Sequence, residues 1–187
     1  MKYSSEHHNW DMTVMASSRL VTLGENIEKN DYSFSAFTGS MLLAVAGLES
    51  FLNSIAHTLS INDSEFPYIE FDRKGIVEKL DFLLDKFSIS LNKGERPYQT
   101  IKKAVTWRNS VVHSKPFYVE ETMIEPRQDI RKLPKQYKSN DNKYPPYENL
   151  VSKENADRFN RDIIKIIESI KSISGLNPRA QCSYTIT

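Results

Sequence analysis

Arg108, Asn109 and His113 lie within one short segment and could act together on a phosphodiester. If the segment is helical, Asn109 and His113 are four residues apart and therefore share a face. Arg108 falls on an aliphatic stripe with Ile101, Val105 and Val112. A guanidinium there cannot lose its charge, so it needs an anionic partner or a wet cleft. The segment offers a fixed cation, an amide and a titratable imidazole.

These groups suit the cleavage of RNA by transesterification. The ribose 2′-hydroxyl must lose a proton, the 5′-oxygen must gain one, and charge builds on the phosphoryl oxygens. Histidine titrates in the range that proton transfer requires, and arginine donates planar, charge-assisted hydrogen bonds to phosphate. No step requires a metal ion. The structural alternative is that Arg108 pairs with a carboxylate such as Glu49, while His113 caps helix carbonyls.

The elements that position these residues are predicted to be helices, because apolar residues recur at helical spacing in five segments. The expected helices cover residues 10–28, 33–59, 72–87, 97–113 and 152–174. Asp72 is a plausible N-cap for the third helix, and Pro97 suits the first position of the fourth. The sequence therefore predicts an all-α protein, an antiparallel bundle of about five helices.

A long irregular insert, residues 114–150, is expected before the last helix, because it holds five prolines and shows little periodicity. It contains more basic residues than acidic ones, with tyrosines between them, a composition that can bind single-stranded RNA. The residues expected to contact RNA are Lys115, Arg131, Lys132 and Lys135. The alternative is a solvated loop with no specific partner. The helical core would span about 10–174, followed by a C-terminal tail, 175–187.

The second expected helix is the most apolar and should lie at the centre, buried on more than one side. It nevertheless carries Glu49, Asn53 and His57 at successive intervals of four residues. Three polar groups in a row on such a helix should face something polar. One interpretation is that Glu49 and Asn53 meet the arginine and asparagine of the motif and orient the site. The other is a hydrogen-bond network in the core, with His57 emerging at the helix end.

The Arg-Asn-x-x-x-His motif, on the penultimate helix of a small bundle, resembles the HEPN superfamily. Residues 46–53 and 76–80 also resemble HEPN helices in type and order. The resemblance covers about residues 10–173 and implies a single HEPN-like domain, residues 1–187, that forms a homodimer through its motif helices. It also implies an RNA-cleaving toxin or antiviral-defence effector.

In such an enzyme Arg108 and His113 would be catalytic, Asn109 would orient the phosphate or the imidazole, and Glu49 would hold the arginine. An antitoxin protein encoded nearby is a further expected partner. Some members that are paired with a nucleotidyltransferase antitoxin have a tyrosine two residues after the histidine, where this chain has Lys115. The alternative function is a non-catalytic HEPN module that binds RNA or a partner protein, because a fold alone does not prove catalysis.

The composition limits these functions. Lys and Arg number 25 against 24 Asp and Glu, so RNA binding needs a local basic patch rather than overall charge. The single cysteine, Cys182, permits neither an internal disulfide nor a cysteine-based metal cluster. We therefore expect a cytoplasmic protein with no metal and no cofactor. The most apolar run, residues 41–48, is too short to span a membrane.

Overall fold

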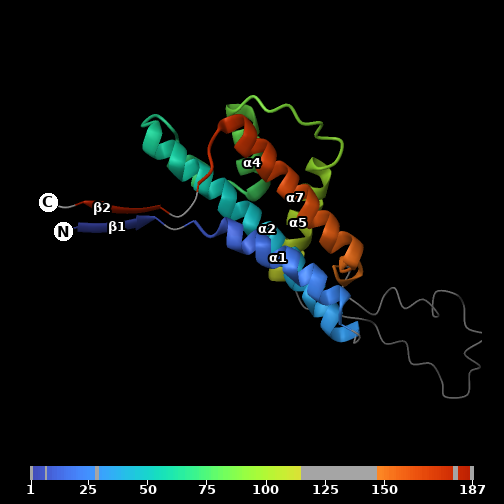
Figure 1. Ribbon diagram of the computed structural model, residues 1–187. Coiled ribbons are helices and arrows are strands. Elements are labelled where there is room, and N and C mark those ends of the chain that lie inside the picture. Colours follow the sequence, from blue (N-terminus) through green and yellow to red (C-terminus); the bar gives the residue numbers. More distant parts are fainter. Residues whose placement is uncertain (1, 7, 28–29, 115–146, 179–180, 186–187) are drawn as a thin grey trace, which may run out of the picture.

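The computed structural model describes residues 2–6, 8–27, 30–114, 147–178 and 181–185 (Figure 1). Within these ranges the chain is helical apart from one pair of short strands, and the predicted all-α class is confirmed. The α-helices are α1 (Trp10–Glu25), α2 (Asn30–Asn62), α3 (Tyr68–Asp72), α4 (Ile76–Lys86), α5 (Tyr98–Val112) and α7 (Lys153–Ser174). A short 3₁₀ helix, η3 (Glu148–Leu150), precedes α7.

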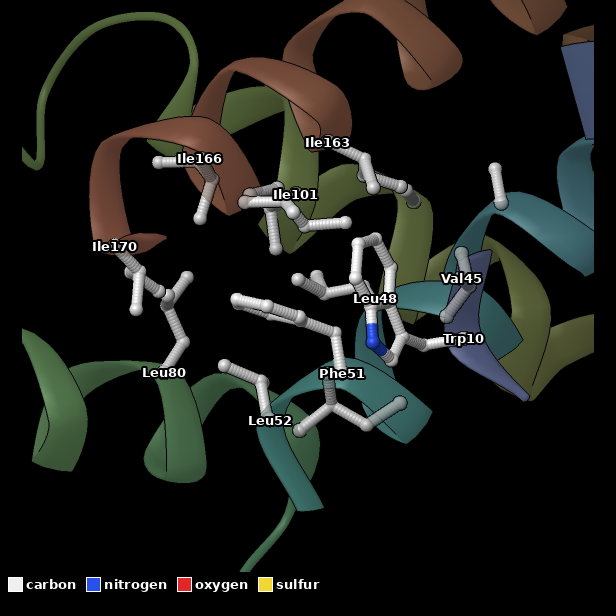
Figure 2. Close-up of a cluster of buried hydrophobic side chains, with 14 of the residues drawn as sticks. Trp10, Val45, Leu48, Phe51, Leu52, Leu80, Ile101, Ile163, Ile166 and Ile170 are labelled. Atoms are coloured by element: carbon white, nitrogen blue, oxygen red, sulfur yellow. The ribbon is translucent and has the colours of Figure 1, made fainter. Parts of the chain in front are cut away.

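Helix α2 lies at the centre of the bundle, as its composition predicts. It contacts α1, α3, α4, α5 and α7. Its central residues are at most 1% exposed: Met41, Ala44, Val45, Leu48, Phe51, Leu52, Ile55 and Ala56. Figure 2 shows Leu48 and Phe51 meeting Trp10 of α1, Leu80 of α4 and Ile163 of α7 in one cluster. The apolar stripes of the outer helices thus converge on α2.

A buried polar network joins α1, α2 and α7. The hydroxyl of Ser17 lies 2.7 Å from the carbonyl oxygen of Ser40 and 2.6 Å from Oδ1 of Asn160. The amide of Asn160 in turn donates to the hydroxyl of Ser40 at 2.9 Å. All three residues are at most 5% exposed. Because an unsatisfied buried polar group is costly, this network fixes how the three helices are aligned.

An ion pair at the start of α5 fixes that helix to α7. Arg96 donates from Nε and Nη2 to the two oxygens of Asp162, at 2.8 and 2.9 Å. The Asp162 side chain is 8% exposed. Burial by itself would raise the pKa of Asp162, but the hydrogen bonds from Arg96 and Thr100 outweigh it and hold that pKa below its ordinary value of 3.8.

The chain ends form a feature that the sequence did not reveal. Strands β1 (Lys2–Glu6) and β2 (Gln181–Thr185) pair antiparallel, with Lys2 opposite Thr185 and Glu6 opposite Gln181. Figure 1 shows this ribbon extending from the helical bundle. The indole of Trp10 donates to the carbonyl of Pro178 at 2.7 Å and so fixes the two terminal segments together. The predicted tail is therefore partly a strand.

Several element boundaries differ from the predictions. Helix α1 ends at Glu25 and α2 begins at Asn30, so the break lies before the predicted one. The short helix α3 lies between the second and third predicted helices, and Asp72 is its last residue rather than the cap of α4. Gly75 precedes α4 instead, and its backbone N–H donates to Glu78.

The predicted boundaries of the other two helices agree better with the structure. Pro97 lies just before α5 rather than in its first position. Ser152 caps the start of α7 by accepting a hydrogen bond from the backbone of Asn155, and Gly175 ends the helix with φ of 70°. Glycine suits this left-handed conformation because it has no Cβ.

By length and composition alone, Asp31–Asn62 is a candidate membrane span. This segment is much longer than residues 41–48, the apolar run that is too short to span a membrane. The shortness of that run therefore does not exclude a span. Half of its most apolar window is nevertheless buried in the structure, and the core helix of a soluble protein passes the same criterion. The absence of a membrane partner stays a prediction.

Asp162→Asn should lower the free energy of unfolding at neutral pH by about 1–3 kcal/mol, because the variant leaves the buried end of the Arg96 pair uncharged. A lowered pKa stabilises the fold above the ordinary value of 3.8, and this contribution is lost as pH falls through the folded-state pKa. The difference in unfolding free energy between parent and variant should therefore become smaller below about pH 4, which urea unfolding experiments can measure. Asp157→Asn, in an exposed pair on the same helix, is the control. A gap that stays constant with pH would contradict this account.

Candidate functional site

Helix α5 is held against the bundle by its inner face, and this decides where the motif points. Ile101 and Ala104 are fully buried, and Trp107 is 2% exposed. The Trp107 indole packs edge-on against Phe159 of α7, with ring centroids 6.2 Å apart. With this face turned inward, the next residue, Arg108, emerges at the side of the helix nearest α2 and α4.

Arg108 is held by two oxygen atoms. Its Nη2 donates to Oε2 of Glu49 on α2 at 2.8 Å, and its Nη1 donates to Oδ1 of Asn109 at 3.0 Å. The side chains of Arg108 and Glu49 are 27% and 33% exposed. Arginine has five N–H donors, so these two contacts orient the guanidinium and leave donors for an anion. The predicted Glu49–Arg108 contact is confirmed.

The pair lies at the edge of a groove of about 230 Å³ between α2, α4 and α5. The groove is lined by Glu49, Gly75, Ile76, Val77, Glu78, Val105, Arg108 and Asn109. Both carboxylates in this lining already have a donor: Glu49 bonds to Arg108, and Glu78 to the backbone N–H of Gly75. An anion that enters the groove would bind at the guanidinium and the amide, beside the negative charges of Glu49 and Glu78.

His113 is the residue that ends α5. Its backbone N–H donates to the carbonyl of Asn109 at 3.0 Å. Its side chain is exposed, and among the described residues no hydrogen bond or ion pair joins it to Arg108 or Asn109. The imidazole is thus open to a substrate or to a second chain.

The surroundings of Arg108 differ from a buried aliphatic stripe. Arg108 was expected to lie on such a stripe and to need an anionic partner or a wet cleft. The structure shows that this stripe runs from the core to solvent, since Ile101 is fully buried and Val112 is 56% exposed. Glu49 of the same chain supplies the anionic partner. The need to pair Arg108 therefore gives no argument for a dimer.

Asn53 does not take part in the motif. Its Oδ1 accepts from Nζ of Lys79 on α4 at 2.9 Å, so the interpretation that Asn53 meets the motif is wrong. Sequence reasoning missed Lys79, which is 4% exposed. The sequence did contain a signal, because Lys79 lies four residues before Leu83 and therefore on the same face as the apolar stripe. The third member of the series, His57, lines a separate cavity.

The insert returns to the motif helix. Nε1 of Trp107 donates to the carbonyl of Tyr147 at 2.9 Å. Because the insert also begins directly after His113, both of its ends lie beside the last turns of α5. The residues predicted to bind RNA, Lys115, Arg131, Lys132 and Lys135, lie outside the described part of the chain.

Comparison with known proteins assigns no family to this chain. No family model matches the sequence, and neither the curated proteins nor the solved structures contain a match. The protein is all-helical without a family assignment. Its candidate site must be judged from its own geometry.

Glu49→Gln should cost less than about 1 kcal/mol of stability, because a partly exposed ion pair contributes little. The amide keeps an acceptor for Arg108 but loses the charge. Urea unfolding would measure this cost. Glu168→Gln, which removes a similar contact with Lys171, is the matched control. A loss above about 2 kcal/mol would mean that the pair serves mainly to stabilise the bundle.

Proposed function

We propose that this chain is a metal-independent endoribonuclease of the HEPN type, acting as a cytoplasmic toxin or antiviral-defence effector. The observation that carries the proposal is the orientation of Arg108 by Glu49 and Asn109 at a groove. His113 ends the same helix about one turn further on, with its side chain exposed. Such a set combines a positioned phosphate ligand with an imidazole that can transfer a proton.

In the proposed reaction the 2′-oxygen of a ribose forms a bond to the neighbouring phosphorus, and the bond from phosphorus to the 5′-oxygen breaks. The 2′-hydroxyl gives up a proton, and the leaving 5′-oxygen receives one; His113 performs one of these transfers. Arg108 stabilises the charge that builds on the phosphoryl oxygens. Asn109 orients the phosphate or the imidazole, and Glu49 positions Arg108.

A second copy of the chain would complete this chemistry. The reaction needs one group to accept a proton and another to donate one, whereas a single copy offers one histidine in the motif. Val112, next to His113, is 56% exposed although it is aliphatic. Packing α5 against α5 of another copy would bury Val112 and bring two motifs together. This is the homodimer that we propose.

RNA binding beyond the motif falls to the insert in this proposal. Lys115, Arg131, Lys132 and Lys135 would contact phosphates, since a chain with a net charge of +1 needs a local basic patch. A toxin of this kind would also need a neutralising partner. The non-catalytic alternative is supported by the absence, among the described residues, of a hydrogen bond between the His113 imidazole and the side chain of Arg108 or Asn109. It predicts RNA binding without cleavage.

The purified protein should cleave single-stranded RNA in the presence of EDTA and leave 2′,3′-cyclic phosphate ends, which mass spectrometry can identify. His113→Ala should slow cleavage by about a hundredfold or more, the scale of losing a proton-transfer group. Arg108→Lys should also impair cleavage, because an ammonium cannot reproduce the planar fork. Lys103→Ala, an exposed change on the same helix, is the control. Cleavage that requires magnesium or persists in His113→Ala would refute this mechanism.

The protein should sediment as a dimer at micromolar concentration in analytical ultracentrifugation. Val112→Glu should shift it to the monomer, because it places a charge in the proposed interface. Ile173→Glu introduces the same charge at a residue that is 57% exposed on α7, and it should leave the dimer intact. A monomeric parent protein, or equal effects of both substitutions, would remove α5 from the interface.

A further inference from the structure

A second cavity, of about 300 Å³, opens along the same helix as Glu49. It lies between α2, the start of α3 and the segment before α1. The residues that matter here are His8, Ser50, Asn53, Ser54, His57 and Tyr68. Its described lining residues supply hydroxyls, amides and aromatic rings, and none of them is a carboxylate. A cavity of this size and character can hold a small polar ligand.

Three rings form the aromatic part of the lining. The ring centroids of His57 and Tyr68 lie 6.2 Å apart at an interplanar angle of 76°. Those of His8 and His57 lie 6.3 Å apart at 62°. These are edge-to-face contacts, so the rings do not stack face to face with one another. Histidine and tyrosine faces are the surfaces on which proteins stack unpaired bases.

Asn53 lines this cavity with a side-chain amide whose orientation is set by one hydrogen bond. Nζ of Lys79 can only donate, so the atom it meets at 2.9 Å has to be Oδ1 of Asn53. The amide NH₂ is therefore directed away from Lys79, and its orientation is fixed. Ser50, one residue after Glu49, adds a hydroxyl. A ligand with carbonyl and ring-nitrogen acceptors would match these groups.

The charge around Asn53 favours an electron-rich ligand. Lys79 is 4% exposed, and its ion pair with Asp72 is long, at 3.9 Å, with an Asp72 side chain that is 63% exposed. The ammonium therefore lies just behind the amide without a close carboxylate. The described lining residues carry no carboxylate either, so the groups that the structure describes favour an acceptor-rich base over a metal cation.

We propose that this cavity binds a nucleobase, stacked on its rings and hydrogen-bonded to Asn53 and Ser50. The inference rests on the proposed function in one respect: the base would belong to an RNA strand that also reaches Arg108. Glu49 and His57 are separated by eight residues of α2, roughly 12 Å along the helix. An RNA strand covers that distance in a few nucleotides. A free nucleotide presents the same base, so the experiment has to distinguish a base within an RNA strand from a free nucleotide.

Binding should be measured on the full chain carrying His113→Ala, so that RNA is not consumed. The probes are adenosine, cytidine, guanosine and uridine, inorganic phosphate, and a short single-stranded RNA, each followed by NMR of the side-chain amides. At least one uncharged nucleoside should shift the Asn53 amide signal, and inorganic phosphate should not displace it. The RNA should compete with that nucleoside if the base comes from a strand. Nucleoside binding without competition by RNA would identify a free nucleotide as the ligand.

Asn53→Asp is the decisive variant. The carboxylate still accepts from Lys79, so the fold keeps this contact, but the donor toward the cavity becomes a negatively charged acceptor. Nucleoside affinity should fall by about tenfold or more, the scale of a lost hydrogen bond with added repulsion. Asn62→Asp, an exposed position on the same helix, adds the same charge and should change nothing.

The outcomes separate the two proposals. Nucleoside binding in a protein that cleaves no RNA would support the base site and reject the ribonuclease. RNA cleavage by the parent protein, with no nucleoside bound and equal behaviour of Asn53→Asp and Asn62→Asp, would reject the base site and leave the ribonuclease standing. Displacement of the nucleoside by inorganic phosphate would show an anion site and overturn the proposal for a base.

Discussion

The burial of α2 on several sides is the constraint on which the rest of the structure depends. A helix in this position cannot leave polar side chains without partners, because an unsatisfied buried group costs about 1–3 kcal/mol. Three polar residues of α2 therefore bond to neighbouring helices. Ser40 bonds to Asn160 of α7, Glu49 to Arg108 of α5, and Asn53 to Lys79 of α4. The apolar surface drives packing, and these contacts decide which residue of each helix meets α2.

The polar contacts of α2 differ in their exposure to water. This difference distinguishes contacts that stabilise the fold from a contact whose groups a ligand can reach. Ser40 is fully buried, and Asn160 is 5% exposed. Glu49 and Arg108, by contrast, are about a third and a quarter exposed. A wetted ion pair adds little to stability, and its groups can exchange partners at low cost. Arg108 is thus oriented by the fold, while its partly exposed guanidinium keeps donors that neither Glu49 nor Asn109 occupies.

The sequence predicted what depends on long periodic patterns. The core helices α2 and α7 follow from their apolar spacing, and the pairing of Glu49 with Arg108 was foreseen because each stood out as a charge on an apolar helix. The short helix α3 has too few residues for a periodic signal. The contact from Trp10 to Pro178 and the pairing of the terminal strands join segments far apart in the chain, which local patterns do not encode. Lys79 looked like an ordinary surface residue, because lysine is rarely buried.

Helix α4 links the two candidate sites. Ile76 and Glu78 line the groove beside Arg108, and the next residue, Lys79, holds the amide that faces the second cavity. The two sites share α2, which lines both of them, and α4 contributes to the second one only through the contact of Lys79 with Asn53. A shift of α4 that widened the groove would also turn or release the Asn53 amide. Because α4 packs rigidly against α2, a change in the geometry of one site would also change the geometry of the other.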